Sequence, residues 1–176
     1  AVSDSGYLGN PYRAARVFGA AVPENVPRTR SSRALNLRAI GDLGSPNAPR
    51  SAIRGSYRYF WDNWEIKAHT LEGGYSRYVG ESFLLDGFVR HYRQSKASFY
   101  SDDAQVQNTY VTRNRQLGTY SGNTLGGKVT YSWRKVPGQY EIKFNGALEL
   151  LRYRYSDYTD LRSGGAYSLN ASVLQL

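Results

Sequence analysis

The sequence predicts an all-β fold: an antiparallel up-and-down transmembrane β-barrel, to which this chain supplies about seven or eight strands. Several segments alternate between apolar and polar residues, a period of two that places successive side chains on opposite faces of a strand. These segments exceed the usual five or six residues of soluble strands and reach the roughly 9–11 that a membrane-spanning strand needs. The chain also has 16 tyrosines against 6 phenylalanines, and Tyr suits a membrane–water interface.

The N-terminal part of the chain is expected to hold one strand and one long loop. Residues 1–6 look like the tail of a strand, and residues 7–30 contain three prolines and several turn formers, which predicts a loop. The AARVFG segment within that loop could form a short strand. Alternation over residues 33–43 predicts the next strand, and GSPNAP at 44–49 predicts a turn.

The segment 51–80 shows the clearest alternation and predicts a long hairpin. Its two runs meet at the turn pair Asp62-Asn63, which Trp61 and Trp64 flank. Ile66 and Ala68 fall on the wrong face of the return run, which a bulge or a strand end outside the apolar band would explain. One face of the first run is formed by Ile53, Gly55, Tyr57, Tyr59 and Trp61.

Four more strands are expected after this hairpin. A turn at 80–82 leads into a strand at 83–93, and the polar segment 94–116 predicts a second long loop. Strands at 117–135 and 140–155 flank a turn at 136–139 with Pro then Gly at its centre. After a medium loop at 156–165, the last strand, 166–176, aligns Tyr167, Leu169, Ala171 and Val173 on one face.

The connections are sorted by length between the two ends of the strands. The connections at 7–30, 62–63, 94–116 and 156–165 fall at one end, and the short turns at 44–50, 80–82 and 136–139 fall at the other. Outer-membrane barrels have long external loops and short periplasmic turns. The sorting therefore predicts an external side that holds the long loops, and a C-terminus on the periplasmic side.

The strand count predicts an incomplete barrel. Seven strands and a stub do not match the even number, eight or more, of single-chain bacterial barrels. We expect residues 1–176 to form the C-terminal portion of a single barrel domain, completed by a second chain or by a missing N-terminal segment. An eight-stranded barrel that uses residues 10–19 as a strand is the alternative, which Asn10-Pro11 disfavours.

Composition leaves two classes of function open. Without cysteine, neither a disulfide framework nor a thiolate metal site can form, and the net charge is +9. Nucleic acid, anionic solutes in a pore, or lipopolysaccharide phosphates would each explain that charge. A soluble basic β-protein that binds nucleic acid or other polyanions is therefore the alternative to a membrane barrel.

The candidate functional residues divide by face, and none forms a catalytic constellation. His69 and His91 lie on separate strands, and the loop acids Asp102, Asp103, Asp157 and Asp160 lack a Ca²⁺-loop spacing, so no metal, cofactor or enzymatic activity is expected. Candidates for a lumen-facing set are Arg38, Arg54, Arg58, Glu72, Asp86, Arg90, Lys128, Arg134, Lys143 and Glu149. Candidates for aromatic girdles at the membrane interfaces are Tyr57, Tyr59, Trp61, Trp64, Tyr75, Tyr131 and Trp133.

Several segments resemble a known family. SDSGYLGNPYRAARV, VPENVPRTRSSRALNLR, YRYFWDNWEIKAHTLEGGY and QSKASFYSDD, in that order, are similar to the C-terminal half of a Gram-negative outer-membrane family described as a domain of unknown function (number thirty-five seventy). The resemblance implies an outer-membrane β-barrel with a cleaved signal peptide and no established activity. Two departures are the missing N-terminal half and the final Val-Leu-Gln-Leu, where such barrels commonly end in an aromatic residue.

Together these observations predict a channel, transport or scaffold component of the cell outer membrane. The expected partners are outer-membrane lipid and lipopolysaccharide, with periplasmic or surface proteins as further candidates. Nucleic acid is not an expected partner in this hypothesis.

Overall fold

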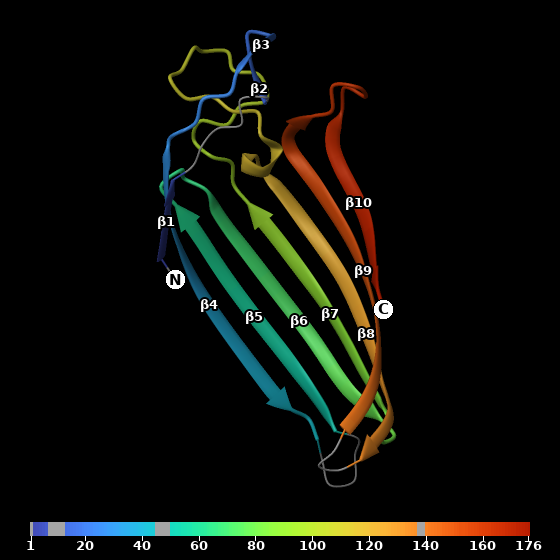
Figure 1. The fold of residues 1–176 in the computed structure, drawn as a ribbon. Helices are drawn as coiled ribbons and strands as arrows, with labels where there is room; N and C mark the ends of the chain where they lie inside the picture. The colour runs from blue at the N-terminus through green and yellow to red at the C-terminus, as the bar shows by residue number, and fades with distance from the viewer. Residues whose placement is uncertain (1, 7–12, 45–49, 137–139) are drawn as a thin grey trace.

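A computed structural model describes residues 2–6, 13–44, 50–136 and 140–176 and contains one large antiparallel sheet (Figure 1). The sheet has eight strands in the order β1-β4-β5-β6-β7-β8-β9-β10, and a separate hairpin is formed by β2 and β3. Apart from the inserted hairpin, each strand pairs with its neighbour along the chain. The all-β, antiparallel and up-and-down class predicted from the sequence is confirmed. The sheet is open, with β1 and β10 as its edge strands.

Seven of the strands are long, and β1 is the predicted stub. The bounds are β1 Val2–Gly6, β2 Ala14–Val17, β3 Ala20–Pro23, β4 Thr29–Asp42, β5 Ser51–Asp62, β6 Lys67–Val79, β7 Phe83–Gln94, β8 Tyr120–Val136, β9 Tyr140–Thr159 and β10 Ala166–Gln175. A three-residue 3₁₀-helix, η1, spans Arg115–Leu117. No helix in the described ranges is long and apolar enough to cross a membrane.

The alternative topology, with residues 10–19 as a strand of the barrel, is wrong for the described part of that segment. Ala14 to Val17 pair with residues 20–23 in the small hairpin, not with the large sheet. Asn10 and Pro11 lie outside the described residues, as do the turn segments 45–49 and 137–139.

The two faces of the large sheet differ in chemistry and in burial. Directly paired residues share a face, so Tyr57, Leu71 and their partners along the register form one continuous surface. That surface is convex, and its apolar side chains are exposed, with Leu71 60%, Val89 59% and Leu125 56% accessible. The alternate residues lie on the concave face, where converging side chains shield one another and are mostly half-buried.

The buried core lies at one end of the sheet, where the long connections pack into a cap (Figure 1). We use "cap" for residues 13–28, 62–66 and 95–119. One of its clusters contains Trp64, Ile66, Ala97, Tyr100 and Leu117, and the other contains Ala15, Ala104 and Val111. Backbone hydrogen bonds join the two long loops, from Phe18 N to Ala104 O and from Val111 N to Asn25 O. The turn at residues 80–82 lies at the opposite end of the strands.

The last strand differs from the sequence-based expectation. Leu169, Ala171 and Val173 are aligned as predicted, but they pair with Tyr153, Leu151 and Glu149 and so share the concave, charged face. The register shifts between Ala166 and Ser168, and this irregularity decides which side of β10 faces outward. Its convex positions are Ser168, Asn170, Ser172 and Leu174.

Candidate functional site

The candidate site is the concave face, where the register places nine of the ten predicted lumen-facing residues. One cross-strand row, for example, runs from Arg38 through Ser56 and Glu72 to Arg90. The nine residues are Arg38, Arg54, Arg58, Glu72, Asp86, Arg90, Lys128, Lys143 and Glu149. The side chain of the tenth, Arg134, lies outside the described part of the structure.

An ion pair between Arg54 and Asp86 spans three strands of this face. Arg54 Nη2 lies 2.7 Å from Asp86 Oδ1, and Arg54 Nη1 donates to Asp86 Oδ2 at 3.2 Å. Ser76 on the intervening strand β6 donates its hydroxyl to Asp86 Oδ2 at 2.7 Å and accepts from Arg54 at 3.0 Å. The two-point geometry and the shared hydroxyl fix both charges in place.

Gly74 makes that crossing possible. A Cβ at position 74 would lie 2.6 Å from Arg54 Cζ and Nε, so any larger residue would displace the guanidinium. The side chain of Arg54 therefore lies directly against the backbone of β6. A similar arrangement occurs at Gly126 on β8, where a Cβ would lie 2.2 Å from the Phe88 ring.

A second ion pair continues the charged surface toward the cap. Arg90 donates its Nε to Glu72 Oε2 at 2.8 Å, and its guanidinium also lies 5.3 Å from the centre of the Phe88 ring. Arg38 lines a small hollow with Arg54 and Glu72. The concave face therefore carries positive and negative charges, several of them held in ion pairs, and six of the nine candidate residues are basic.

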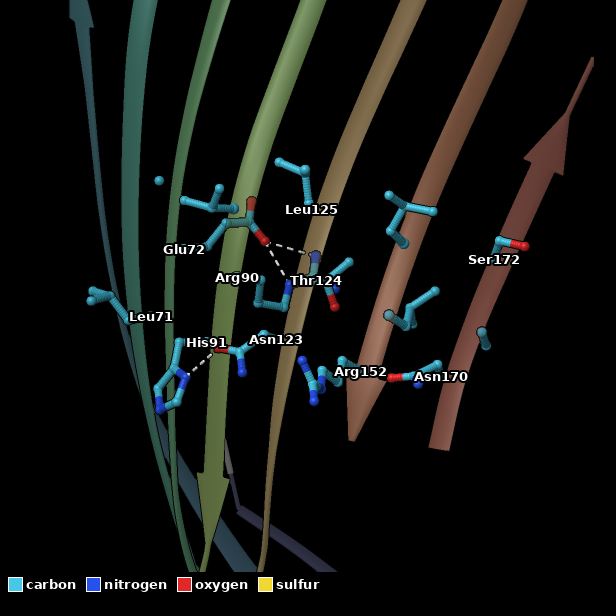
Figure 2. Close-up of a pocket in the computed structure, with 15 residues that line it drawn as sticks. Leu71, Glu72, Arg90, His91, Asn123, Thr124, Leu125, Arg152, Asn170 and Ser172 are labelled. Atoms are coloured by element: carbon cyan, nitrogen blue, oxygen red, sulfur yellow. Dashed lines mark hydrogen bonds and ion pairs between the residues drawn. The ribbon is translucent and has the colours of Figure 1, made fainter. Parts of the chain in front are cut away.

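A hollow of about 980 Å³ lies at the level of the Glu72–Arg90 pair (Figure 2). Three consecutive residues from each of five neighbouring strands line it, namely 71–73, 89–91, 123–125, 150–152 and 170–172. The middle residue of each triplet points to the concave face, and its two neighbours point to the convex face. At this level the convex surface also changes from apolar to polar. The row of Val89, Leu125 and Leu150 is followed, toward the cap, by the row of His91, Asn123 and Arg152.

The two histidines lie on the convex face and have neutral partners. His69 Nδ1 lies 2.7 Å from the Tyr57 hydroxyl, and His91 Nδ1 lies 2.8 Å from Asn123 Oδ1 (Figure 2). Within the described residues, no three His, Asp or Glu side chains come together as metal ligands would. Nothing in these contacts provides a nucleophile with an adjacent base.

Three of the four loop acids, Asp102, Asp103 and Asp157, bond to residues elsewhere in the chain. Asp102 pairs with Arg113 at 2.7 Å and accepts from the amide of Thr159. Asp157 accepts from the amide of Thr119, and Asp103 accepts from the amide of Gly19. The bonds of Asp102 to Thr159 and of Asp157 to Thr119 join the cap to β9, and the bond of Asp103 to Gly19 joins the two long loops of the cap.

The predicted girdle residues separate into a group that is partly or fully exposed and one buried exception. Tyr57, Tyr59 and Trp61 lie on the convex face near the cap, and Tyr75, Tyr131 and Trp133 lie farther toward the short turns. Trp64 is 1% accessible in the cap core and donates its Nε1 to Thr29 O at 3.0 Å. Its prediction as an interface residue is wrong, because residues 63–66 turn inward before β6 begins.

Sequence reasoning also missed the aromatic cluster beneath the cap. Tyr92, Tyr120, Tyr153 and Tyr155 gather on the concave face, with ring centres 5.0 to 6.1 Å apart for the contacts of Tyr120. Tyr100, above them, donates to Asp157 O at 2.9 Å, and its burial raises the pKa of its phenol, with the Asp157 charge acting in the same direction. The alternation of Tyr153 and Tyr155 along β9 was the signal that could have indicated this cluster.

The fold and the site define a class: an all-β protein whose open up-and-down sheet has an apolar, exposed convex face and a charged concave face. The model of the family "Protein of unknown function (DUF3570)" matches residues 1–160. Because the match covers most of the chain, this protein belongs to that family, as the resemblance predicted. Neither the curated proteins nor the solved structures include a match to the chain.

Proposed function

We propose that the chain is a wall segment of an outer-membrane β-barrel, which acts as a channel, transport or scaffold component and not as an enzyme. The observation that carries this proposal is the exposed apolar surface of the convex face. Large apolar side chains that alternate outward over many neighbouring strands are what lipid contact requires, and they would be costly in water.

The cap-side border of the apolar band differs between strands. On β5 the band reaches Trp61 and on β6 it reaches Leu71, whereas on β7, β8 and β9 it ends in one cross-strand row at Val89, Leu125 and Leu150. The border on β5 therefore lies three rows closer to the cap than the border on β7 to β9.

The concave face supports a lumen-facing role. Its ion pairs and its charged side chains, of which Arg54, Glu72, Asp86 and Glu149 are half-buried, resemble the polar interior expected of a membrane barrel. In this proposal the nine concave residues line the interior, and a second chain or another segment pairs with the open edges, one at β1 with the adjoining part of β4 and one at β10. Unpaired strand edges within a bilayer would leave backbone groups unsatisfied.

Three single-tryptophan proteins would test membrane insertion, because the three tryptophans differ in exposure. Each protein retains one of Trp61, Trp64 or Trp133 and has Phe at the other two positions. In vesicles of brominated lipid, Trp133, which is 60% accessible, and the convex-face Trp61 should be quenched. Trp64, buried in the cap, serves as the internal control and should keep its emission.

The competing function, a soluble basic protein that binds nucleic acid or other polyanions, makes opposite predictions. It requires the protein to stay in solution without detergent and to bind polyanions with steep salt dependence. Recovery in the soluble fraction, together with unquenched Trp61 and Trp133, would overturn the membrane proposal.

A further inference from the structure

Charges are unequally divided between the two faces of the large sheet. At the paired positions of β4 to β10, the convex face has no Asp or Glu. The acids of these paired positions all occupy the concave face: Asp42, Asp62, Glu72, Asp86, Glu141 and Glu149. In place of acids, the described convex positions carry these basic residues: Arg33, Lys67, His69, Arg77, His91, Arg93, Arg152 and Arg154.

Three of these arginines form a cluster near the cap, which we call the convex arginine cluster: Arg93, Arg152 and Arg154. Arg93 and Arg154 both pair with Ser121 on the strand between them, so their backbones lie two strand spacings, about 10 Å, apart. Arg152 lies one convex position before Arg154 on β9, one row farther from the cap. All three side chains are exposed, and none has an ion-pair partner among the described residues.

The side chains that lie between these basic residues are small and polar, and none of them is a carboxylate. Ser121 lies between Arg93 and Arg154, and Asn123 lies between His91 and Arg152. In Figure 2, Arg152 lies between Asn123 and Asn170. By register this row lies one row closer to the cap than Val89, Leu125 and Leu150. Hydroxyl and amide donors among unpaired guanidinium groups match the oxygen atoms of a phosphate.

The position of the cluster relative to the apolar band indicates what kind of phosphate it would meet. One row closer to the turns, the convex surface is formed by Val89, Leu125 and Leu150, with Val89 59%, Leu125 56% and Leu150 48% exposed. A ligand that spans this border would place an anionic group on the arginines and acyl chains on the adjoining apolar band. A free phosphate ion would use only the first of these two surfaces.

We propose that the convex arginine cluster binds the phosphate groups of a lipid headgroup in the leaflet on the cap side of the membrane. This inference rests on the proposed membrane location and adds to it a specific lipid site with its sidedness. Each basic residue near an anionic membrane surface contributes a factor of about five in affinity. Removal of three should weaken lipid binding by about a hundredfold.

The test compares lipid binding by three forms of the full chain, purified in a neutral detergent. The first is the unaltered protein, and the second carries Arg93→Gln, Arg152→Gln and Arg154→Gln. The third, Arg38→Gln, Arg58→Gln and Lys128→Gln, loses the same formal charge from the concave face. Native mass spectrometry would measure binding of diphosphorylated lipid A and of its dephosphorylated form, and circular dichroism would verify that both variants fold.

The expected result is a loss of about a hundredfold for the convex variant alone, confined to the phosphorylated lipid. Equal binding by all three proteins, or equal binding of both lipids, would overturn the proposal. Full competition by excess inorganic phosphate would also overturn it, because a soluble anion would then suffice. If Trp61 and Trp133 are quenched by lipid while the convex variant binds normally, the lipid site alone fails and the membrane proposal stands.

Discussion

Arg54 of β5 reaches across the backbone of β6 at Gly74 to form a two-point ion pair with Asp86 of β7. The contact depends on a residue that takes no part in it, because only the absence of a side chain at position 74 leaves room for the guanidinium. It joins three neighbouring strands on the concave face. A charge pattern that looks like simple alternation in sequence is therefore a defined set of partners in three dimensions.

Gly74→Val is expected to break the Arg54–Asp86 contact and to destabilise the sheet by about 1–3 kcal/mol, the usual cost of overpacking. The new side chain would occupy the space of the Arg54 guanidinium. Gly73→Val is the matched control, because a Cβ at that position meets nothing within 4 Å. Urea unfolding in detergent would measure both, and equal stability of the two variants would contradict the structural role of Gly74.

Trp64→Ala should loosen the cap without disrupting the long strands. Loss of a buried aromatic side chain typically costs about 3–5 kcal/mol, and this one also removes the hydrogen bond to Thr29 O. Limited proteolysis should cut within residues 95–119 sooner, while the β-sheet signal in circular dichroism persists. Trp133→Ala is the control, since that exposed side chain lies at the other end of the sheet. An unchanged cleavage rate in the Trp64 variant would contradict the cap assignment.

Asp102→Asn should weaken the junction between the long loop and β9. Arg113 is 9% exposed, donates to Asp102 and to Thr159 O, and lies 4.4 Å from the centre of the Tyr158 ring. Without its carboxylate partner the guanidinium is left partly buried, at a cost of about 1–3 kcal/mol. Hydrogen exchange should rise at residues 99–114, whereas the neighbouring Asp103→Asn, which affects an exposed bond to Gly19, should change less. Equal exchange in the two variants would count against this brace.

The cap should lose stability in alkaline solution through Tyr100. Burial raises the pKa of its phenol above the ordinary value of 10.0, so the folded cap retains the proton that an unfolded cap would release. The stabilisation is fully present below about pH 10 and declines as pH rises above it. Emission from a protein with Trp64 as its single tryptophan would report cap opening. Tyr100→Phe should flatten this alkaline transition, and an unchanged transition would assign it to other groups.

Much of the fold could be predicted from local pattern. Alternation predicted seven long strands and a stub, because a period of two encodes which residues share a face. The same pattern placed residues such as Arg54, Glu72 and Arg90 on one face before any pairing was known. It could not reveal that Trp64 turns inward, because flanking tryptophans at a hairpin tip look alike in sequence whether they face lipid or a loop core.

By itself the sequence determined the strand periodicity, the separation of apolar and charged faces, and the family. These properties follow from residue types at fixed spacing along one chain. Only the tertiary structure decided the cap, the face that β10 presents outward, and the convex arginine cluster. Each depends on register and on contacts between segments far apart in the chain: Asp102 with Thr159, Leu169 with Tyr153, and Arg93 with Arg154 across Ser121. A shift of one residue in pairing would move every side chain of a strand to the other face, so the partner strand, not the local pattern, decides these positions.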